Sequence, residues 1–482
     1  MIVGAGPAGL SVAYFLKQNG YRNVTVMEKL GRVGGLCFTV TEDYTCFDLG
    51  ANYLTPDYTE TLRLAREFKV EHYAERHILV AEVDPTKPRY KVVSPWTAAR
   101  GVTPLLRFIF ACFKYAWLRW RLGAVVNPPG HAGISRRPDL CVPFSAWLKA
   151  NELECLQWLF EMPITVMGYG FIEEIPAPYA LKYMSVPTFA AMCLKALPIT
   201  GWWPWPRRFR LGYQWLWQRV ARELNVWLDI EIEEITRADG GRCVIRYKHC
   251  EQNLHDERWE TDEFPFDHLI LACPLSPDVL SKFLVLSGEE RNLFSQVVTF
   301  AYCMTSLKVS LPGFPPDYAM ATIPLTPIGT PWAITKQADT SSFIQFYSRM
   351  DPRDLRDDEA TRKAVLEEVR ALIARLGGDP NRINDDAWHS FDRWPYFKHV
   401  PSEAIRDGFY DRFEALQGSQ STFYVGGLMD FELVERIVRY SKKLVSERFP
   451  PVLPQDEDSP TSPRRDRARH AHVASRRHRR RG

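Results

Sequence analysis

Short apolar runs and amphipathic segments alternate along the first part of the chain. Ile2–Val3 and the run 24–27 are typical of buried strands, and an amphipathic helix is predicted to begin at about Pro7 between them. These elements predict a β-α-β unit that is followed by an extended arm up to about residue 95. The first strand is shorter than the usual length of about 5–6 residues. We therefore expect that this sequence begins late, because of a truncated gene model or a removed N-terminal segment.

Turn residues and changes of periodicity place further elements later in the chain. Alternating or continuous apolar runs predict strands, and helical spacing of apolar residues predicts helices. The predicted elements are an amphipathic helix at 215–224, strands at 228–233 and 243–247 joined by the turn 239–241, a buried parallel strand within 267–275, and a long helix at 358–376. This alternation of strands and helices predicts an α/β protein.

The stretch 103–126 combines large apolar residues with basic ones. Arg107, Lys114, Arg119 and Arg121 interrupt the apolar sequence, whereas a membrane-spanning helix needs about 20 mostly apolar residues. We therefore expect that this helix does not span a membrane. A peripheral membrane contact, or a place at the entrance for a lipophilic ligand, is one interpretation. Packing within a large domain is the commoner alternative.

The strongest chemical signal is a glycine motif directly after the first strand. Gly4, Gly6 and Gly9 form the pattern Gly-x-Gly-x-x-Gly between that strand and the following helix. The first glycine permits a tight turn, the second lets the backbone approach a pyrophosphate, and the third lets the helix pack closely on the strand. The helix then directs its free N–H groups and positive dipole end at the anion.

The choice of ligand is narrowed by four residues that follow the second strand. Glu28 follows Gly9 by about 20 residues, where a carboxylate binds the ribose hydroxyls of an adenosine and repels a 2′-phosphate. Arg32 adds a positive charge, and Gly34 and Gly35 give a second close approach of the backbone. The alternative is a tight glycine turn in an ordinary β-α-β unit.

A second part of the same site is expected near the C-terminus. The apolar run 422–425 leads into Gly426 and Gly427 and then into a helical stretch, so the chain returns there to the first domain. Taken in this order, the elements at the two ends of the chain indicate an FAD-binding protein.

Composition and charge limit the class of protein. The chain has 482 residues, 46% of them apolar and 25% charged, which is average for globular proteins and fits a large soluble enzyme. Ten cysteines show neither Cys-x-x-Cys nor Cys/His ligand spacing, so we expect no metal site and no disulfide framework. A reducing compartment, and hence a cytoplasmic location, is expected.

Residues 451–482 form a basic tail that we expect to be disordered. Within it, 464–482 contain nine arginines and one aspartate, a charge of +8, so that the rest of the chain carries −5 of the total of +3. Such a tail could bind nucleic acid, anionic lipid or an import receptor, but a solvated appendage is the favoured interpretation. No basic aromatic surface elsewhere supports binding of nucleic acid, and no such partner is expected.

Several motifs resemble the flavin-containing amine oxidase superfamily. They are the glycine motif 4–9, Glu28, 32–35, 47–50, 271–274 and 426–427. The stretches 167–183, 394–400, 417–424 and 440–445 resemble one branch of it, the FAD-dependent polyenoic fatty acid isomerases. Proteins similar to β-cyclopiazonate dehydrogenase share the general framework.

The resemblance implies an α/β fold of two interleaved domains. The first is a Rossmann-like FAD-binding domain of the GR2 type, and the second is an α+β substrate-binding domain. The expected boundaries are 1–95, 205–290 and 391–450 for the FAD-binding domain, 96–204 and 291–390 for the substrate-binding domain, and 451–482 for the tail.

The resemblance also implies cofactor contacts. Gly50 would pass close to the isoalloxazine, the Ile232 backbone would meet the adenine, and N–H groups near Val434 would face flavin N1 and O2. Gly426 and Gly427 would run along the ribityl chain and the pyrophosphate. Position 427 departs from the superfamily, which usually has an acidic residue there. No cysteine stands where covalent attachment would be expected, so the FAD is expected to be non-covalent.

Substrate residues are implied less directly. Arg76 aligns with the arginine that grips a fatty-acid carboxylate in the isomerases, and a surface arginine is the alternative. Tyr169, Trp394 and Tyr396 are expected to line the substrate face. Lys308 does not fall where amine oxidases keep a lysine near flavin N5. No catalytic side chain is assigned, because the flavin carries the chemistry.

The expected function is FAD-dependent hydride abstraction from a lipophilic small molecule. Isomerisation of a double bond in a polyunsaturated fatty acid is the first interpretation. The second is a net dehydrogenase or oxidase of an amine or a secondary metabolite, and the third is a non-catalytic flavoprotein. The oligomeric state does not follow from the sequence.

Overall fold

The computed structural model describes most of the chain. The described residues are 1–42, 45–74, 79–83, 90–92, 102–196, 206–237, 243–252, 257–312, 314, 319–323, 329–336, 343–350, 357–383 and 388–452. Arg76, the turn 239–241 and almost all of the predicted tail lie outside the described residues.

A five-stranded parallel sheet assembles the two ends of the chain. Its strands follow the order β19-β13-β1-β2-β9, and every pairing is parallel. They are β1 (Ile2–Val3), β2 (Thr25–Met27), β9 (Asn225–Trp227), β13 (Leu269–Leu271) and β19 (Thr422–Tyr424). The sheet draws strands from all three segments expected for the FAD-binding domain. The domain boundaries themselves stay a prediction.

The first strand is as short as the sequence indicates. Backbone bonds beyond its two residues hold it in the sheet, because the amide of Ile270 donates to the carbonyl of Met1 and that of Ala272 donates to Val3, each at 2.9 Å. The helix α1 (Pro7–Gln18) follows and packs against α16 (Val434–Arg448) and α10 (Tyr213–Ala221).

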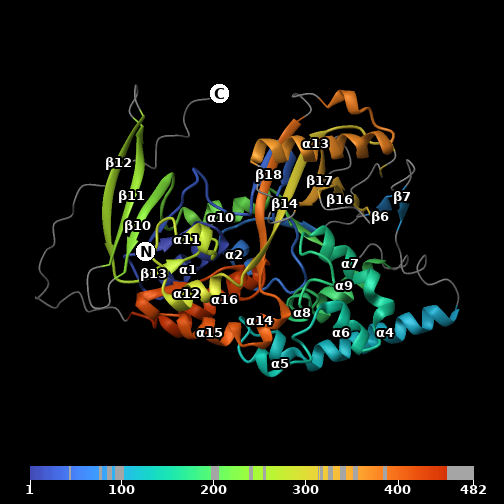
Figure 1. Cartoon of the computed structure of the whole chain (residues 1–482), viewed down its shortest axis with the longest axis horizontal. Helices are drawn as coiled ribbons and strands as arrows, with labels where there is room; N and C mark the ends of the chain where they lie inside the picture. Colours follow the sequence, from blue (N-terminus) through green and yellow to red (C-terminus); the bar gives the residue numbers. More distant parts are fainter. Residues whose placement is uncertain are drawn as a thin grey trace, which may run out of the picture.

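A three-stranded antiparallel sheet stands beside the parallel one (Figure 1). It contains β10 (Ile230–Thr236), β11 (Cys243–Gln252) and β12 (Glu257–Phe266). The predicted pairing of the first two is confirmed, whereas no strand is predicted from the sequence for β12.

A larger seven-stranded sheet carries the second layer, in the order β18-β14-β17-β16-β15-β6-β7. Its strands are β6 (Leu79–Val83), β7 (Tyr90–Val92), β14 (Val298–Lys308), β15 (Ala319–Thr322), β16 (Pro331–Lys336), β17 (Phe343–Met350) and β18 (Trp388–His399). The helix α13 (Asp358–Arg375) confirms the predicted long helix, and it packs on this sheet around a separate apolar core. The long strands β14 and β18 reach from this sheet down to the helical part (Figure 1).

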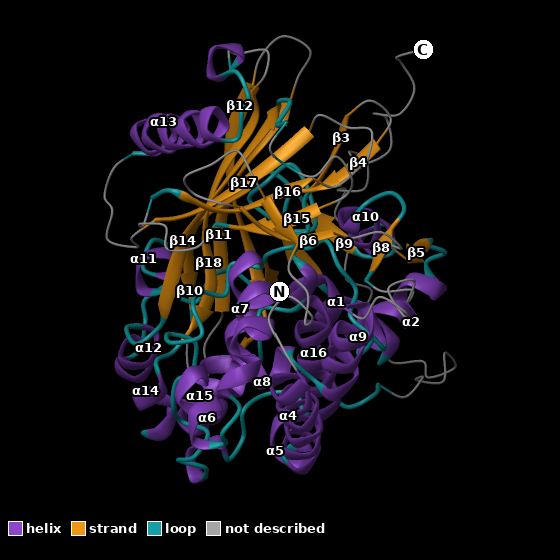
Figure 2. Ribbon diagram, turned by 90° about the vertical axis from the view of Figure 1, so that its right-hand side faces the viewer, coloured by secondary structure: helices purple, strands orange, loops and turns teal. Residues whose placement is uncertain are grey.

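Most of the remaining helices gather below the sheets, whereas α11 lies beside them (Figure 2). They are α2 (Glu60–Glu67), α4 (Val102–Arg121), α5 (Gly123–Val126), α6 (Phe144–Ala150), α7 (Gln157–Val166), α8 (Ala177–Tyr183), α9 (Val186–Ala196), α11 (Pro277–Leu280), α12 (Gly288–Phe294), α14 (Ser402–Arg406) and α15 (Phe409–Leu416). Two short antiparallel pairs join β3 (Thr39–Glu42) to β4 (Thr45–Asp48) and β5 (His72–Ala74) to the distant β8 (Arg207–Phe209). Among the described residues, no helix has the length and apolar character needed to cross a bilayer.

Candidate cofactor and substrate site

The first glycine motif forms the turn between β1 and α1. Gly4 has a φ of +107°, and a Cβ there would lie 3.0 Å from the carbonyl oxygen of Ala272. A Cβ on Gly9 would lie 2.0 Å from the carbonyl oxygen of Gly4, so helix and strand are packed too closely for any side chain. Gly6 differs, because a Cβ there would meet only the Cα of Gly35, at 3.8 Å. The structure therefore leaves free space in front of Gly6.

The second glycine pair closes this space from the other side. The amide of Gly34 donates to the carbonyl of Ala5 at 2.9 Å, and Gly34 has a φ of +109°. Gly35 has a φ of +53°, and a Cβ there would lie 3.1 Å from the Cα of Gly6. Two stretches of bare backbone thus face each other at the uncapped N-terminus of α1. This is the arrangement that a pyrophosphate requires.

Glu28 is tied to the same turn. Its side chain is 8% exposed, and its carboxylate accepts hydrogen bonds from the amides of Ala5 at 2.8 Å and Leu30 at 3.0 Å. Its carbonyl accepts from the amide of Ile230 at 2.9 Å, which brings the start of β10, and with it Ile232, next to the end of β2. The carboxylate is therefore held at the mouth of the glycine turn, where a ribose would lie.

Arg32 supplies a positive charge beside Glu28. Its guanidinium donates to the carbonyl of Gly35 at 2.9 Å and lies over the ring of Phe38 at 4.2 Å. Burial lowers the pKa of Arg32, and the nearby carboxylates of Glu28 and Asp392 oppose that shift. An arginine side chain keeps its charge under such conditions, so this cation remains available to a phosphate.

Gly50 lies against the segment that follows the second glycine pair. A Cβ on Gly50 would be 1.7 Å from the carbonyl oxygen of Leu36, so only glycine fits there. The neighbouring Asp48 fixes this loop, because its carboxylate accepts from the hydroxyl of Thr39 at 2.6 Å and the amide of Tyr213 at 2.8 Å. Burial raises the pKa of Asp48 to about 6, and the positive charge of Arg208 opposes only part of this rise. Sequence reasoning gave Asp48 no positioning role.

Gly426 and Gly427 follow β19 and begin the short helix η5 (Gly427–Met429). Gly426 has a φ of +131°, and a Cβ there would meet nothing within 4 Å. A Cβ on Gly427 would instead lie 2.6 Å from Oε2 of Glu432. The Glu432 carboxylate thus fills the space that an acidic side chain at position 427 would occupy. Its Oε2 is buried and has no hydrogen-bond partner among the described residues.

Glu432 has no signal in the sequence that could have identified it. It follows the glycine pair by five positions in an irregular segment, and only the fold brings its carboxylate back beside Gly427. Directly after it, α16 begins at Val434 with Leu433 as its N-cap and no side-chain cap. The first N–H groups of α16 therefore remain able to bind an anionic group.

The predicted substrate residues Tyr169, Trp394 and Tyr396 form part of one aromatic wall. The rings of Tyr169 and Tyr396 stack at 5.9 Å, and Tyr396 stacks on Tyr302 at 5.5 Å. Trp394 pairs with Tyr302 across β18 and β14 and packs in the same cluster. The hydroxyl of Tyr169 donates to the carbonyl of Glu432 at 3.0 Å, which joins this wall to the segment after Gly427.

Burial keeps these phenols neutral. It raises the pKa of Tyr169, Tyr302 and Tyr396 well above the ordinary value. The wall is therefore uncharged across the physiological pH range. Sequence reasoning did not include Tyr302 in it. Lys308 lies away from this wall at the end of β14, where it forms an ion pair with Glu42.

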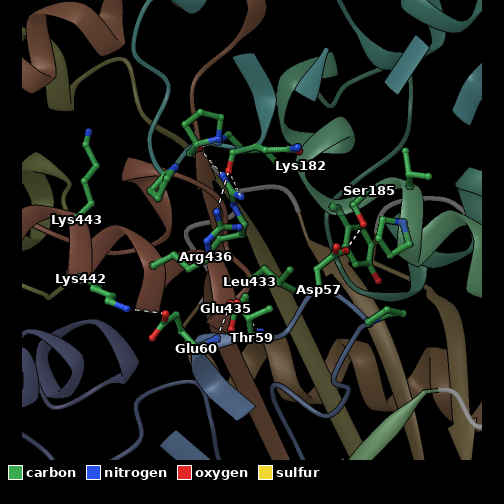
Figure 3. A pocket seen from close by; sticks show the side chains of 18 of the residues that line it. Asp57, Thr59, Glu60, Lys182, Ser185, Leu433, Glu435, Arg436, Lys442 and Lys443 are labelled. Carbon is green, nitrogen blue, oxygen red and sulfur yellow. Dashed lines mark hydrogen bonds and ion pairs between the residues drawn. The ribbon is translucent and has the colours of Figure 1, made fainter. Parts of the chain in front are cut away.

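A separate cavity of about 1000 Å³ lies beside α16 (Figure 3). Most of the residues that line it are of polar or charged types, and they include Asp57, Glu60, Lys182, Arg436 and Lys443. A buried cluster of charges lies against it, in which Asp430 forms ion pairs with Lys182 at 2.5 Å and Arg436 at 2.8 Å. Charged side chains thus line this cavity, whereas none belongs to the aromatic wall.

Known proteins resemble this chain in sequence and in fold. A family model of the NAD(P)-binding Rossmann-like domain matches residues 2–68. The FAD-dependent oxidoreductase dpasF of Apiospora sacchari is 23% identical over 442 residues, which cover 88% of this chain and 87% of that protein. A polyenoic fatty acid isomerase of Ptilota filicina is 32% identical over 200 residues, 38% of this chain and 40% of that protein. The crystal structure of a CLA-producing fatty acid isomerase from P. acnes has a TM-score of 0.70 at 23% identity, over 93% of this chain and 98% of that one.

The fold and the glycine-lined cradle define a flavoprotein with a Rossmann-like cofactor domain. In sequence and in fold the chain resembles the amine oxidase superfamily of FAD-dependent oxidoreductases. The predicted α/β class and the family resemblance are confirmed, and FAD is the cofactor that this family implies. The individual contacts assigned to the cofactor stay predictions that the geometry around Gly6, Gly35 and Glu28 fits.

Glu28→Ala is expected to weaken FAD binding without unfolding the chain. The change removes a carboxylate that would hydrogen-bond the ribose and that also orders Ala5 and Leu30, so we expect a loss of about 1–3 kcal/mol of binding free energy. Titration of the apoprotein with FAD, followed by flavin fluorescence, measures it. Glu223→Ala, at an exposed surface position, is the control. An unchanged affinity in Glu28→Ala would remove Glu28 from the site.

Proposed function

We propose that this chain binds FAD non-covalently and isomerises a double bond of a polyunsaturated fatty acid. The observation that carries the proposal is the neutral aromatic wall of Tyr169, Tyr302, Trp394 and Tyr396, joined through Glu432 to the glycine pair 426–427. Likeness to two fatty acid isomerases supports it, one in sequence over part of the chain and one in fold over nearly all of it.

The cofactor contacts follow from the cradle described above. Gly6 and Gly35 leave room for the pyrophosphate, Arg32 supplies a charge to it, and Glu28 binds the adenosine ribose. Bound FAD supplies a two-electron centre that can accept a hydride from a substrate carbon and return it. The aromatic wall holds the hydrocarbon chain and excludes water. No side chain needs to act as an acid or a base, and none is assigned that role.

Glu432 replaces the acidic residue that the superfamily usually has at position 427. The buried Oε2 of its carboxylate has no hydrogen-bond partner among the described residues and lies beside Gly427, so we propose that it accepts a hydrogen bond from a ribityl hydroxyl. An unpaired buried carboxylate destabilises the empty protein. Binding of the cofactor would satisfy it.

Glu432→Ala should therefore have opposite effects on two measurements. The apoprotein should be as stable as the parent or more so, because a buried oxygen without a hydrogen-bond partner is removed, whereas FAD affinity should fall by about 1.5–3 kcal/mol. Thermal unfolding of the apoprotein and FAD titration measure the two quantities. An apoprotein that loses stability together with affinity would indicate that Glu432 is a structural residue only.

The decisive test of the reaction uses linoleic acid in the absence of oxygen. A redox-neutral isomerase returns a product of unchanged mass and consumes no external acceptor, so conjugated-diene absorbance should grow through many turnovers. Arg76→Ala should raise KM for the free acid far more than for its methyl ester, because only the acid presents a carboxylate to the guanidinium. Arg66→Ala, an exposed arginine on α2, is the matched control.

Two results would contradict the isomerase proposal. Turnover that stops after one equivalent of flavin, with a product lighter by two hydrogens, would instead indicate a net dehydrogenase or oxidase. The nearly full-length likeness to an FAD-dependent oxidoreductase favours that second candidate. A preference for amines over acids would indicate the same. Bound FAD without any turnover of acids or amines would leave a non-catalytic flavoprotein.

A further inference from the structure

A continuous stripe of large apolar side chains lies exposed along α4. Of the fifteen exposed large apolar side chains among the described residues, six belong to this helix. They are Leu106 (62% exposed), Ile109 (43%), Phe110 (70%), Phe113 (72%), Trp117 (51%) and Trp120 (72%). Their spacing of three or four residues places them on one face of the helix. The opposite face, which includes Ala111, Tyr115 and Arg119, is buried against the protein.

Basic residues form a row along one side of the stripe. Arg107, Lys114 and Arg121 follow one another at seven-residue spacing, so they lie almost in line along the helix. The guanidinium of Arg121 lies over the ring of Trp117 at 4.8 Å, which places this row directly beside the stripe. Lys114 also pairs with the exposed Glu152 at 2.7 Å. The helix itself has no acidic residue.

The position of α4 makes this face accessible. The helix lies along the edge of the helical layer, and its N-terminal end projects past its neighbours (Figures 1 and 2). Trp120 near its C-terminal end also lines the charged cavity beside α16. An exposed apolar face of this size on a soluble domain marks an interaction surface.

We propose that this face of α4 docks on an anionic membrane surface. A bilayer interface accepts tryptophan and phenylalanine at the level of the headgroups, and a row of arginine and lysine beside them binds anionic lipid. A second copy of the chain fits less well, because antiparallel two-fold pairing of this helix would bring the basic rows of both copies together with no acidic residue on α4 to neutralise them. The inference is independent of the cofactor and of the reaction.

Sedimentation with lipid vesicles tests the proposal on the full chain. The protein should bind phosphatidylcholine vesicles that contain phosphatidylserine, bind vesicles of phosphatidylcholine alone more weakly, and be partly released by salt, which screens exposed charges. Phe113→Ser/Trp117→Ser should reduce binding about tenfold or more. Trp259→Ser/Val285→Ser removes two exposed apolar side chains far from α4 and should leave binding unchanged. Arg107→Gln/Arg121→Gln should weaken the preference for phosphatidylserine.

A measurement on the unaltered chain guards against a variant that fails to fold. Vesicles should slow amide hydrogen exchange in the region 106–121 more than in β12. Vesicles that contain brominated lipid should also quench tryptophan fluorescence. Absence of vesicle binding by the folded wild-type chain would overturn the proposal. So would a dimer in lipid-free solution that Phe113→Ser/Trp117→Ser dissociates, because the face would then pair with a second copy.

Discussion

Gly6→Val is expected to abolish FAD binding while the chain still folds. The backbone of Gly6 has a φ of −78°, which any residue can adopt, and a Cβ there meets only the Cα of Gly35 at 3.8 Å. Valine therefore fits the protein, but its methyl groups would fill the space that the pyrophosphate needs. The purified variant should be colourless, should not take up added FAD, and should keep the circular dichroism spectrum of the parent apoprotein.

Gly288→Val is the matched control for this variant. Gly288 begins α12, and a Cβ there would meet nothing within 4 Å, but it lies outside the cradle. That variant should keep its flavin. Normal FAD affinity in Gly6→Val would show that the cofactor does not pass this glycine, and the glycine motif would then be only a structural turn.

Arg237→Met is expected to destabilise the fold by about 3–5 kcal/mol, because it leaves a buried carboxylate without its partner. Arg237 and Glu290 form a two-point ion pair, at 2.6 Å and 2.9 Å, with side chains only 3% and 2% exposed. The pair joins the end of β10 to α12, and Tyr424 donates a further hydrogen bond to Glu290. Urea unfolding of parent and variant measures the loss. Arg210→Met, at an exposed ion pair, should change stability by no more than about 0.5 kcal/mol.

The pH dependence of stability separates this ion pair from simple loss of packing. Burial raises the pKa of Glu290, but the hydrogen bonds from Arg237 and Tyr424 outweigh it and lower the pKa to about 2. A carboxyl with a lowered pKa in the folded state contributes its stability above the ordinary pKa near 4.5 and loses it as the pH falls toward 2. The unfolding free energy of Arg237→Met should therefore depend less steeply on pH in this range than that of the parent. An unchanged slope would mean that the pair does not set the pKa.

The cofactor half of the site could be predicted because its signals are local in the sequence. Gly4, Gly9 and Gly34 stand where the structure leaves no room for a Cβ or requires a positive φ. Such demands act on single positions and so appear directly as glycine at fixed spacing. The buried strand at 269–271 could also be predicted from a local signal. A central parallel strand is apolar on both faces and therefore appears as a continuous apolar run.

The rest depends on contacts between distant parts of the chain. Glu432 reaches the space beside Gly427 only because the segment between η5 and α16 folds back, and no spacing rule describes that path. Tyr302 joins the aromatic wall through its cross-strand pairing with Trp394, more than 90 positions later. The exposed face of α4 is also not evident from sequence, because the same apolar pattern would suit a buried helix.

The flavin content of the purified full-length chain tests the central claim most directly. We predict a yellow protein with about one FAD per chain, released into solution on denaturation because the cofactor is held by backbone and hydrogen bonds alone. The absorption spectrum of the folded protein and the chromatographic identity of the released flavin measure this. A colourless, folded protein that cannot be reconstituted with FAD would contradict the account of both the cradle and the reaction.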